Sequence, residues 1–373
     1  MRKQVMAAVI LAALSPMAMA MAQSDAPAPA AAPAYDAAAA KAAVATLADE
    51  LEKNFVFPDT AKRYAAALRT KLAAGGYDGI TDGYALATAV TADLQAIAPD
   101  GHLAMFAPGG PQSQRVGQPS TQQQIGGAPL PPPAMEQAGM IAPGIAYVRF
   151  NGFFGEPEML KAFTAFLDQH AGAKTLIIDA RTHRGGGLDE MDLLFPRIFD
   201  TPQAVMIMDT RASFAAQAGP LPFRSLVKVD APAELARTEH RVTPASPASP
   251  WAKTKIYYLT SPRTASAAEH LAAVFKGTKR ATLIGETTAG AGHFGGTAPL
   301  GGGYSAFIPV GRSYFPGGDS WEQIGVKPDI AVPPERALYE ALIREGVPAA
   351  QAEALSASHM PTGPMVRRQP GKR

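Results

Sequence analysis

From residue 144 onward, short apolar segments alternate with helical patterns, and this alternation limits the folds that the chain can adopt. Apolar segments that predict strands lie at 145–150, 175–179, 204–208, 256–260 and 282–285, and helical patterns lie at 156–170 and 267–276. Short apolar runs without a polar face are typical of strands that are buried on both sides. Because helices separate several of these strands, we expect largely parallel pairing and an α/β fold.

The residues before this region predict a small helical domain. Apolar residues recur with helical spacing in three stretches, which end at Pro58, at Gly75–Gly76 and at Pro99. Residues 107–139 are rich in Gly, Pro, Gln and Ser without periodicity, and therefore predict a linker or a long surface loop. We predict the following organisation: signal peptide 1–22, Ala/Pro-rich tether 23–40, helical domain 41–106, linker or loop 107–140, α/β catalytic domain 141–348 and tail 349–373.

The first residues have the pattern of a secretory signal peptide. A cationic start, Met1–Lys3, precedes an apolar run, Val5–Leu14, that is too short to span a bilayer. Small residues flank the predicted cleavage sites near Ala20 and Ala22. We therefore expect a periplasmic or secreted protein without a transmembrane segment in the mature chain. The alternatives are a buried N-terminal helix and a retained anchor.

The composition of the 373-residue chain excludes several classes of chemistry. It contains no cysteine, which excludes disulfides, thiol nucleophiles and thiolate metal sites. A net charge of +2 without a basic cluster gives no indication of a nucleic-acid partner. The seven histidines show no short metal-binding spacing, and no Walker or GxGxxG motif is present. We predict neither a metal nor a cofactor.

A serine at a predicted strand-to-helix turn is the first candidate for chemistry. Ser266 follows the strand at 256–260, where the N–H of Ala267 and the helix dipole could stabilise an oxyanion. The same residues also fit a helix cap, because Ser266 and Glu269 have the spacing of a capping box. This motif taken alone favours the cap.

A run of glycines after the strand at 175–179 is the second candidate. Gly185, Gly186 and Gly187 would let main-chain N–H groups approach a ligand closely, as an oxyanion hole or a peptide-binding turn requires. A plain tight turn is the alternative. Further candidates are two histidines beside glycines, His102 and His293, and the segment 321–329; none of them is specific alone.

Together and in this order, the segments resemble the superfamily of tail-specific (C-terminal processing) serine peptidases. Within it, the chain is similar to the branch of interphotoreceptor retinoid-binding protein and the tricorn protease core. The resemblance covers roughly residues 40 to 335 and rests on DGH at 100–102, LIIDARTHRGGG at 176–187, YLTSPRTASAAEHLA at 258–272, ATLIGETTAGAGH at 281–293 and WEQIGVKPDI at 321–330. It implies a crotonase-like (ClpP/crotonase-type) catalytic domain with a helical N-terminal domain.

The resemblance also implies roles for individual residues. Ser266 matches the family nucleophile, but the position of the tail-specific base, a lysine, holds Ala291. The Ser–Lys dyad is therefore absent. In the tricorn-like branch the base is a histidine that matches His102, and a glutamate that matches Glu322 orients it. The residue before this histidine is a serine in that branch and Gly101 here.

The oxyanion donors of the family match the turn Gly185–Gly187 and the N–H of Ala267. The chain is thus expected to be an exported serine-type peptidase that acts on peptides or unfolded proteins. His293 is an alternative base or a residue of the substrate cleft, because it lies near the position of the missing lysine. The other alternative is an inactive or weakly active relative that binds an apolar ligand or a peptide.

Overall fold

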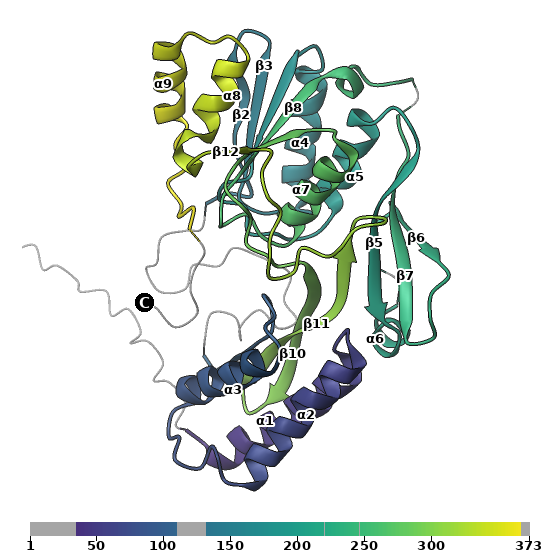
Figure 1. The fold of residues 1–373 in the computed structure, drawn as a ribbon, viewed down its shortest axis with the longest axis vertical. Coiled ribbons are helices and arrows are strands. Elements are labelled where there is room, and N and C mark those ends of the chain that lie inside the picture. Colours follow the sequence, from purple (N-terminus) through teal and green to yellow (C-terminus); the bar gives the residue numbers. More distant parts are fainter. Residues whose placement is uncertain (1–34, 110–131, 220, 246, 367–373) are drawn as a thin grey trace, which may run out of the picture. The chain divides into compact units, whose positions relative to one another are not determined.

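The strands of the described residues pair into two sheets, one mostly parallel and one antiparallel (Figure 1). The structure is a computed structural model, and it describes residues 35–109, 132–219, 221–245 and 247–366. These residues belong to one compact unit, Pro33–Arg373. The signal peptide predicted at 1–22 lies outside the described residues.

The mostly parallel sheet confirms the predicted α/β domain. Its strands, in spatial order, are β12 (Ile330–Ala331), β9 (Thr282–Gly285), β8 (Lys255–Thr260), β4 (Thr175–Asp179), β3 (Ile145–Phe150) and β2 (Met135–Ala142). Only β2 pairs antiparallel, with β3. Both faces are covered, which explains why β3 and β4 are buried along their whole length.

Helices from two parts of the chain cover the two faces of this sheet (Figure 1). One face packs against α4 (Pro157–Gln169), α5 (Asp189–Ile198) and α7 (Ala267–Thr278). The other packs against α8 (Ala337–Arg344) and α9 (Ala349–Ser358). Short 3-10 helices at Pro250–Lys253 and Pro334–Arg336 precede β8 and α8.

The antiparallel sheet corrects one prediction. Its strand order is β1 (Ala104–Phe106), β11 (Tyr304–Tyr314), β5 (Gln203–Arg211), β7 (Leu235–Val242) and β6 (Leu226–Val229), and β10 (His293–Gly301) also pairs with β11. The apolar run at 204–208, which we expected in the parallel sheet, belongs to β5 and pairs antiparallel with β7 and β11. An apolar run predicts a buried strand but does not specify the strand that will pair with it. The short helix α6 (Ala212–Ala218) follows β5.

The three predicted N-terminal helices are present as α1 (Ala37–Asn54), α2 (Pro58–Ala73) and α3 (Gly83–Ile97). Their buried faces share one apolar cluster with β10 and β11, so the helical region and these catalytic-domain strands form a common core. α1 begins inside the predicted tether, because the Asp36 carboxylate accepts the N–H groups of Ala38 and Ala39 and the following alanines favour a helix.

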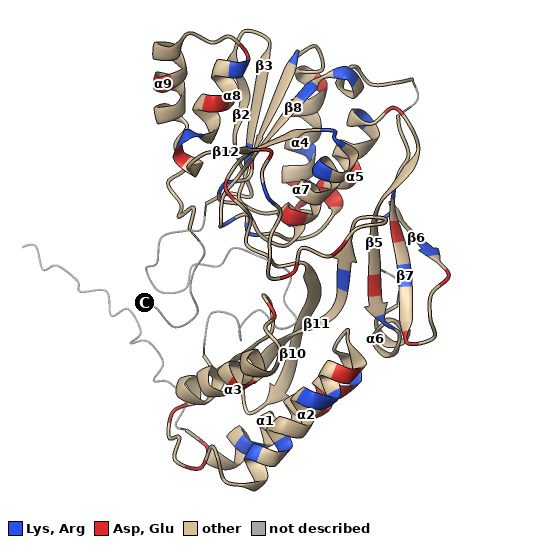
Figure 2. Cartoon of the chain, in the orientation of Figure 1, with Lys and Arg blue, Asp and Glu red and all other residues tan. Residues whose placement is uncertain are grey.

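Two further segments differ from the prediction. β2 begins at Met135, inside the predicted linker, because its residues can pair with β3 although they lack an apolar pattern. α9 occupies residues 349–358 of the predicted tail, where Ala352 and Ser356 are buried. None of the helices in the described ranges has the length and hydropathy that a bilayer crossing needs. Charged residues of both signs are interspersed over the view in Figure 2.

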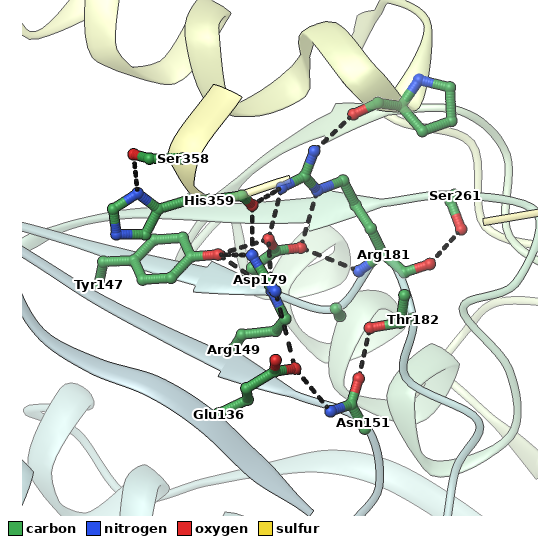
Figure 3. A network of polar contacts seen from close by, with 12 residues as sticks. Glu136, Tyr147, Arg149, Asn151, Asp179, Arg181, Thr182, Ser261, Ser358 and His359 are labelled. Atoms are coloured by element: carbon green, nitrogen blue, oxygen red, sulfur yellow. Dashed lines mark hydrogen bonds and ion pairs between the residues drawn. The ribbon is translucent and has the colours of Figure 1, made fainter. Parts of the chain in front are cut away.

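A buried charge network lies at the carboxyl end of β4 (Figure 3). The Asp179 carboxylate is fully buried and binds Arg181 at 2.6 Å and Arg149 at 3.4 Å, and it accepts the Tyr147 hydroxyl at 2.7 Å. Burial raises the pKa of Asp179, but the two guanidinium groups outweigh it and lower the pKa to about 2. Both arginines also donate to the carbonyl oxygen of His359. The network therefore joins the sheet to the segment after α9.

We expect Asp179→Asn to destabilise the fold strongly, because it leaves two buried guanidinium groups without a counter-charge. The expected loss is about 3–5 kcal/mol in the free energy of unfolding. Urea unfolding measures it. The control is Glu353→Gln, which removes an exposed ion pair with Arg336 and should leave the free energy of unfolding nearly unchanged. Equal losses in the two variants would contradict the structural role of Asp179.

Candidate active site

Ser266 lies in a strained turn between β8 and α7. Its φ of 57° and ψ of −120° are rare for a residue with a side chain. Such strain persists only where neighbouring contacts impose it, and it is frequent at functional sites. One of these contacts is the bond from the Ser266 N–H to the Glu269 carboxylate, at 3.0 Å. Glu269 thus caps the helix as the sequence indicated, but the conformation of Ser266 is not that of an ordinary cap.

The glycine turn lies directly against Ser266. A Cβ atom on Gly185 would lie 2.6 Å from the Cβ of Ser266, and Gly185 has a φ of 104°. A Cβ on Gly186 would lie 1.7 Å from the carbonyl oxygen of Phe153. Only glycine can therefore occupy these two positions. The glycines of the motif at 185–187 therefore allow the main chain of this turn to lie close to Ser266.

The N–H groups of this turn are not equivalent. The Gly185 N–H donates to Nδ1 of His183 at 3.0 Å, and the Gly187 N–H donates to the carbonyl of Phe153 at 2.6 Å. Within the described residues, no acceptor is recorded for the N–H of Gly186 or of Ala267. Burial, followed by the charge of Arg184, lowers the pKa of His183 to about 3. His183 is therefore neutral at pH 7, and its Nδ1 can act as an acceptor.

The carboxylate of Glu269 connects the Ser266 turn with the loop after β9. It is fully buried and accepts the N–H of Ser266 together with those of Gly290, at 2.7 Å, and Ala291, at 2.8 Å. The hydroxyl of Thr288 donates to it at 2.5 Å. Burial raises the pKa of Glu269 and the four hydrogen bonds oppose this, with a net rise.

His293, at the start of β10, pairs with an aspartate of the helical region. Its Nδ1 lies 2.7 Å from Oδ2 of Asp100, and both side chains are buried. The other oxygen of Asp100 accepts the N–H groups of His102 and Leu103. Burial raises the pKa of Asp100, but the hydrogen bond and charge of His293, with these N–H groups, outweigh it, so the pKa is lowered.

Glu322 binds the main chain of two loops. Its carboxylate accepts the N–H groups of Gly292 at 2.6 Å, His293 at 2.9 Å and Gly101 at 2.7 Å. Asp100, His293 and Glu322 together bring potential metal-ligand atoms within 4.8 Å of one another. However, both carboxylates already accept several N–H donors, which a cation would have to displace. The cluster therefore fits a hydrogen-bonded network better than a metal centre.

His102 lies on the same turn as Asp100. Its imidazole stacks on Phe307 of β11, with ring centroids 5.2 Å apart. Glu322 binds the N–H of Gly101, the residue before His102, and its Oε2 lies 3.9 Å from Nδ1 of His293. The roles of His102 as base and of Glu322 as its orienting group stay predictions.

Sequence reasoning missed two residues that the structure brings into this site. Asp100 was part of the quoted DGH motif without a role of its own, and Glu269 was considered only as a helix cap. The available signals were local: an aspartate two residues before His102 can bind the turn's own N–H groups, and Glu269 follows Ser266 by three residues.

Comparison with known proteins gives the family. The sequence profile of peptidase family S41 matches residues 144–332, just over half of the chain. The chain belongs to peptidase family S41. The N-terminal domain of family S41 peptidases in eukaryotic IRBP matches residues 37–142. The two matches together follow the order of the helical region and the α/β domain.

This family member is similar to a curated C-terminal processing peptidase of chloroplasts from Tetradesmus obliquus. The two are 28% identical over 248 residues, which are 62% of this chain and 46% of the relative. The chain thus spans about half the length of that relative. A solved photosystem II D1 C-terminal processing protease is 16% identical with a TM-score of 0.50, over 85% of this chain and 97% of that one. A predicted peptidase from Parabacteroides merdae is 17% identical with a TM-score of 0.51, over 87% and 98%. These likenesses support the fold.

Proposed function

We propose that this S41 family member is an exported serine peptidase that cleaves peptide bonds by acyl transfer through Ser266. The observation that carries the proposal is the strained Ser266 turn with the Gly185 main chain packed against it. A nucleophile held at the end of a strand beside main-chain donors is suited to attack on a carbonyl. Family membership supports the same reaction class.

In the proposed reaction, the oxygen of Ser266 attacks the carbonyl carbon of the scissile bond while a neutral histidine accepts its proton. The carbonyl oxygen becomes an oxyanion, and the N–H groups of Gly186 and Ala267 are the donors we assign to it. The histidine then gives the proton to the leaving amine. Water then attacks the acyl-enzyme and gives a proton to the histidine. The histidine passes a proton to the oxygen of Ser266 as the acid product leaves.

For the base we propose His293 with Asp100 as its orienting carboxylate. A base needs a partner on the nitrogen that does not face the nucleophile, and Asp100 bonds Nδ1 at 2.7 Å. The second carboxylate, Glu322, fixes the main chain of His293. The sequence resemblance favours His102 with Glu322 instead. Each histidine directly follows a glycine whose N–H Glu322 binds, so mutagenesis must separate the two candidates.

We expect Ser266→Ala to abolish hydrolysis of an unfolded reporter protein while leaving the melting temperature nearly unchanged. The side chain supplies the reacting oxygen, whereas a lost cap costs only about 1 kcal/mol. Covalent labelling by a fluorophosphonate should occur in the wild type and disappear in the variant. Ser358→Ala on the exposed end of α9 is the control and should label normally. A folded wild type that never labels would favour the alternative of a binding protein.

The two histidines are distinguished by single variants. If His293 is the base, His293→Ala and Asp100→Asn should each lower kcat by about a hundredfold or more, because proton transfer loses its acceptor or its orientation. His102→Ala should then retain most of the turnover. Steady-state kinetics at several pH values decides. The opposite result, loss in His102→Ala with activity kept in His293→Ala, would reinstate the His102–Glu322 pair.

Export is the second part of the proposal and rests on residues 1–22 alone. We expect the mature chain to begin near Met21 or Gln23 and to reside in the periplasm. Intact-mass measurement on protein from its native host tests the cleavage. A variant with charged residues inserted into Val5–Leu14 is the control and should stay uncleaved. A mass that includes Met1 to Ala20, or recovery from the cytosol only, contradicts export.

A further inference from the structure

A single buried side chain connects the two loops that the proposed chemistry uses. Glu269 is 0% exposed, although it lies on the first turn of α7. Its Oε2 accepts the N–H of Ser266 at 3.0 Å and that of Ala291 at 2.8 Å. Its Oε1 accepts the N–H of Gly290 at 2.7 Å and the hydroxyl of Thr288 at 2.5 Å. Oε2 therefore joins Ser266 to the loop at 288–291, and Oε1 accepts two further donors of the same loop.

We propose that Glu269 is a positioning residue, which fixes the main chain of the nucleophile against the loop that leads to the base. This inference rests on the proposed function and adds a residue that the peptide substrate itself does not touch. One carboxylate sets the separation of Ser266 and Ala291, because both N–H groups converge on the same oxygen atom. We call the four hydrogen bonds of Glu269 the clamp. Because His293 follows Ala291 by two residues, the clamp controls where β10 begins.

An ionised carboxylate is the one side chain of this size that satisfies all four donors. It accepts at both oxygens and donates nothing, whereas an amide would turn two donors of its own toward N–H groups. A buried charge without partners would be costly, but each oxygen here accepts two hydrogen bonds. The contacts of Glu269 thus explain its burial without requiring a counter-ion.

The loop needs such a clamp because glycines interrupt it. Gly290 has a φ of 78°, and Gly292 follows one residue after Ala291. Glycines allow many main-chain conformations, so the positions of Ala291 and His293 depend on external contacts. Thr288 adds a second link, since its hydroxyl oxygen also accepts the N–H of Val326 at 2.7 Å. The loop is therefore held from α7 at one end and from Glu322 at the other.

The principal test is Glu269→Gln, which keeps the size of the side chain and removes its charge. A misplaced nucleophile or base slows the chemical step rather than substrate binding, so we expect kcat to fall about a hundredfold while KM changes by less than about twofold. The rate of fluorophosphonate labelling should fall in parallel. The pH at half-maximal activity should stay constant, because Glu269 does not itself transfer the proton. A folded variant with wild-type kcat would overturn the proposal.

A milder pair of variants keeps the test decisive if Glu269→Gln does not fold. Thr288→Val removes one of the four donors, and Thr288→Ser keeps the hydroxyl. We expect about a tenfold loss of kcat in Thr288→Val and near-normal kcat in Thr288→Ser, because only the valine variant loses the hydrogen bond to the charged carboxylate. Equal kcat values in both variants and the wild type would contradict the clamp.

Hydrogen exchange separates this inference from the proposed function. In Glu269→Gln and in Thr288→Val, peptides that cover 264–272 and 287–294 should exchange faster than in the wild type. A peptide from α2, at 60–72, is the internal control and should not change. If the wild type neither hydrolyses nor labels, the proposed function fails, yet faster exchange would still establish the clamp. Unchanged exchange in both segments would overturn the clamp even in an active enzyme.

Discussion

Burial of the Asp179 carboxylate is the constraint on which the arrangement of the site depends. A carboxylate without contact with water needs opposite charge close by, and Arg181 supplies it two residues further along the chain. Arg181 is thereby fixed, and the turn that follows begins from a defined point. The carbonyl oxygen of Arg181 accepts the hydroxyl of Ser261 at 2.6 Å, and the hydroxyl of Thr264 donates to the carbonyl of Ala180 at 2.8 Å. The ends of β4 and β8 are thus bonded to each other, and the glycine turn lies against the Ser266 turn.

Beyond this anchor, the site is held by carboxylates that bind main-chain N–H groups. Glu269 holds the loop after β9 from the side of α7, and Glu322 holds the same loop together with the Gly101 turn of the helical region. The N–H of Ala291, the residue that the sequence resemblance places at the position of the family lysine, contributes to this network. The ring of Phe57, at the start of α2, lies 5.4 Å from that of His293. The contacts around this loop therefore extend from the α/β domain into the helical region.

Helices and strands whose apolar residues recur with a clear spacing could be predicted from the sequence. The pairing of strands with distant segments could not. The stripes of α1, α2 and α3 and the buried strands β3, β4, β8 and β9 follow directly from apolar spacing. β5 has the same kind of apolar run, but its partners β7 and β11 place it in the other sheet. β2 has exposed positions and no period, since it is stabilised by pairing with β3. Pairing between distant segments leaves little trace in local composition.

The site shows the same division between local and distant information. The strained turn of Ser266 and the close glycines follow from motifs that are contiguous in the sequence, so their positions could be predicted. Asp100 and His293 are separated by 193 residues, and no local spacing predicts that they pair. Their contact arises because β10 and the helical region share one apolar core, which brings the start of β10 to the end of the turn after α3. A histidine in a glycine-rich loop is mobile when only its neighbours in sequence are considered. The buried aspartate from another part of the chain makes it a fixed group, as the proposed role of His293 as general base requires.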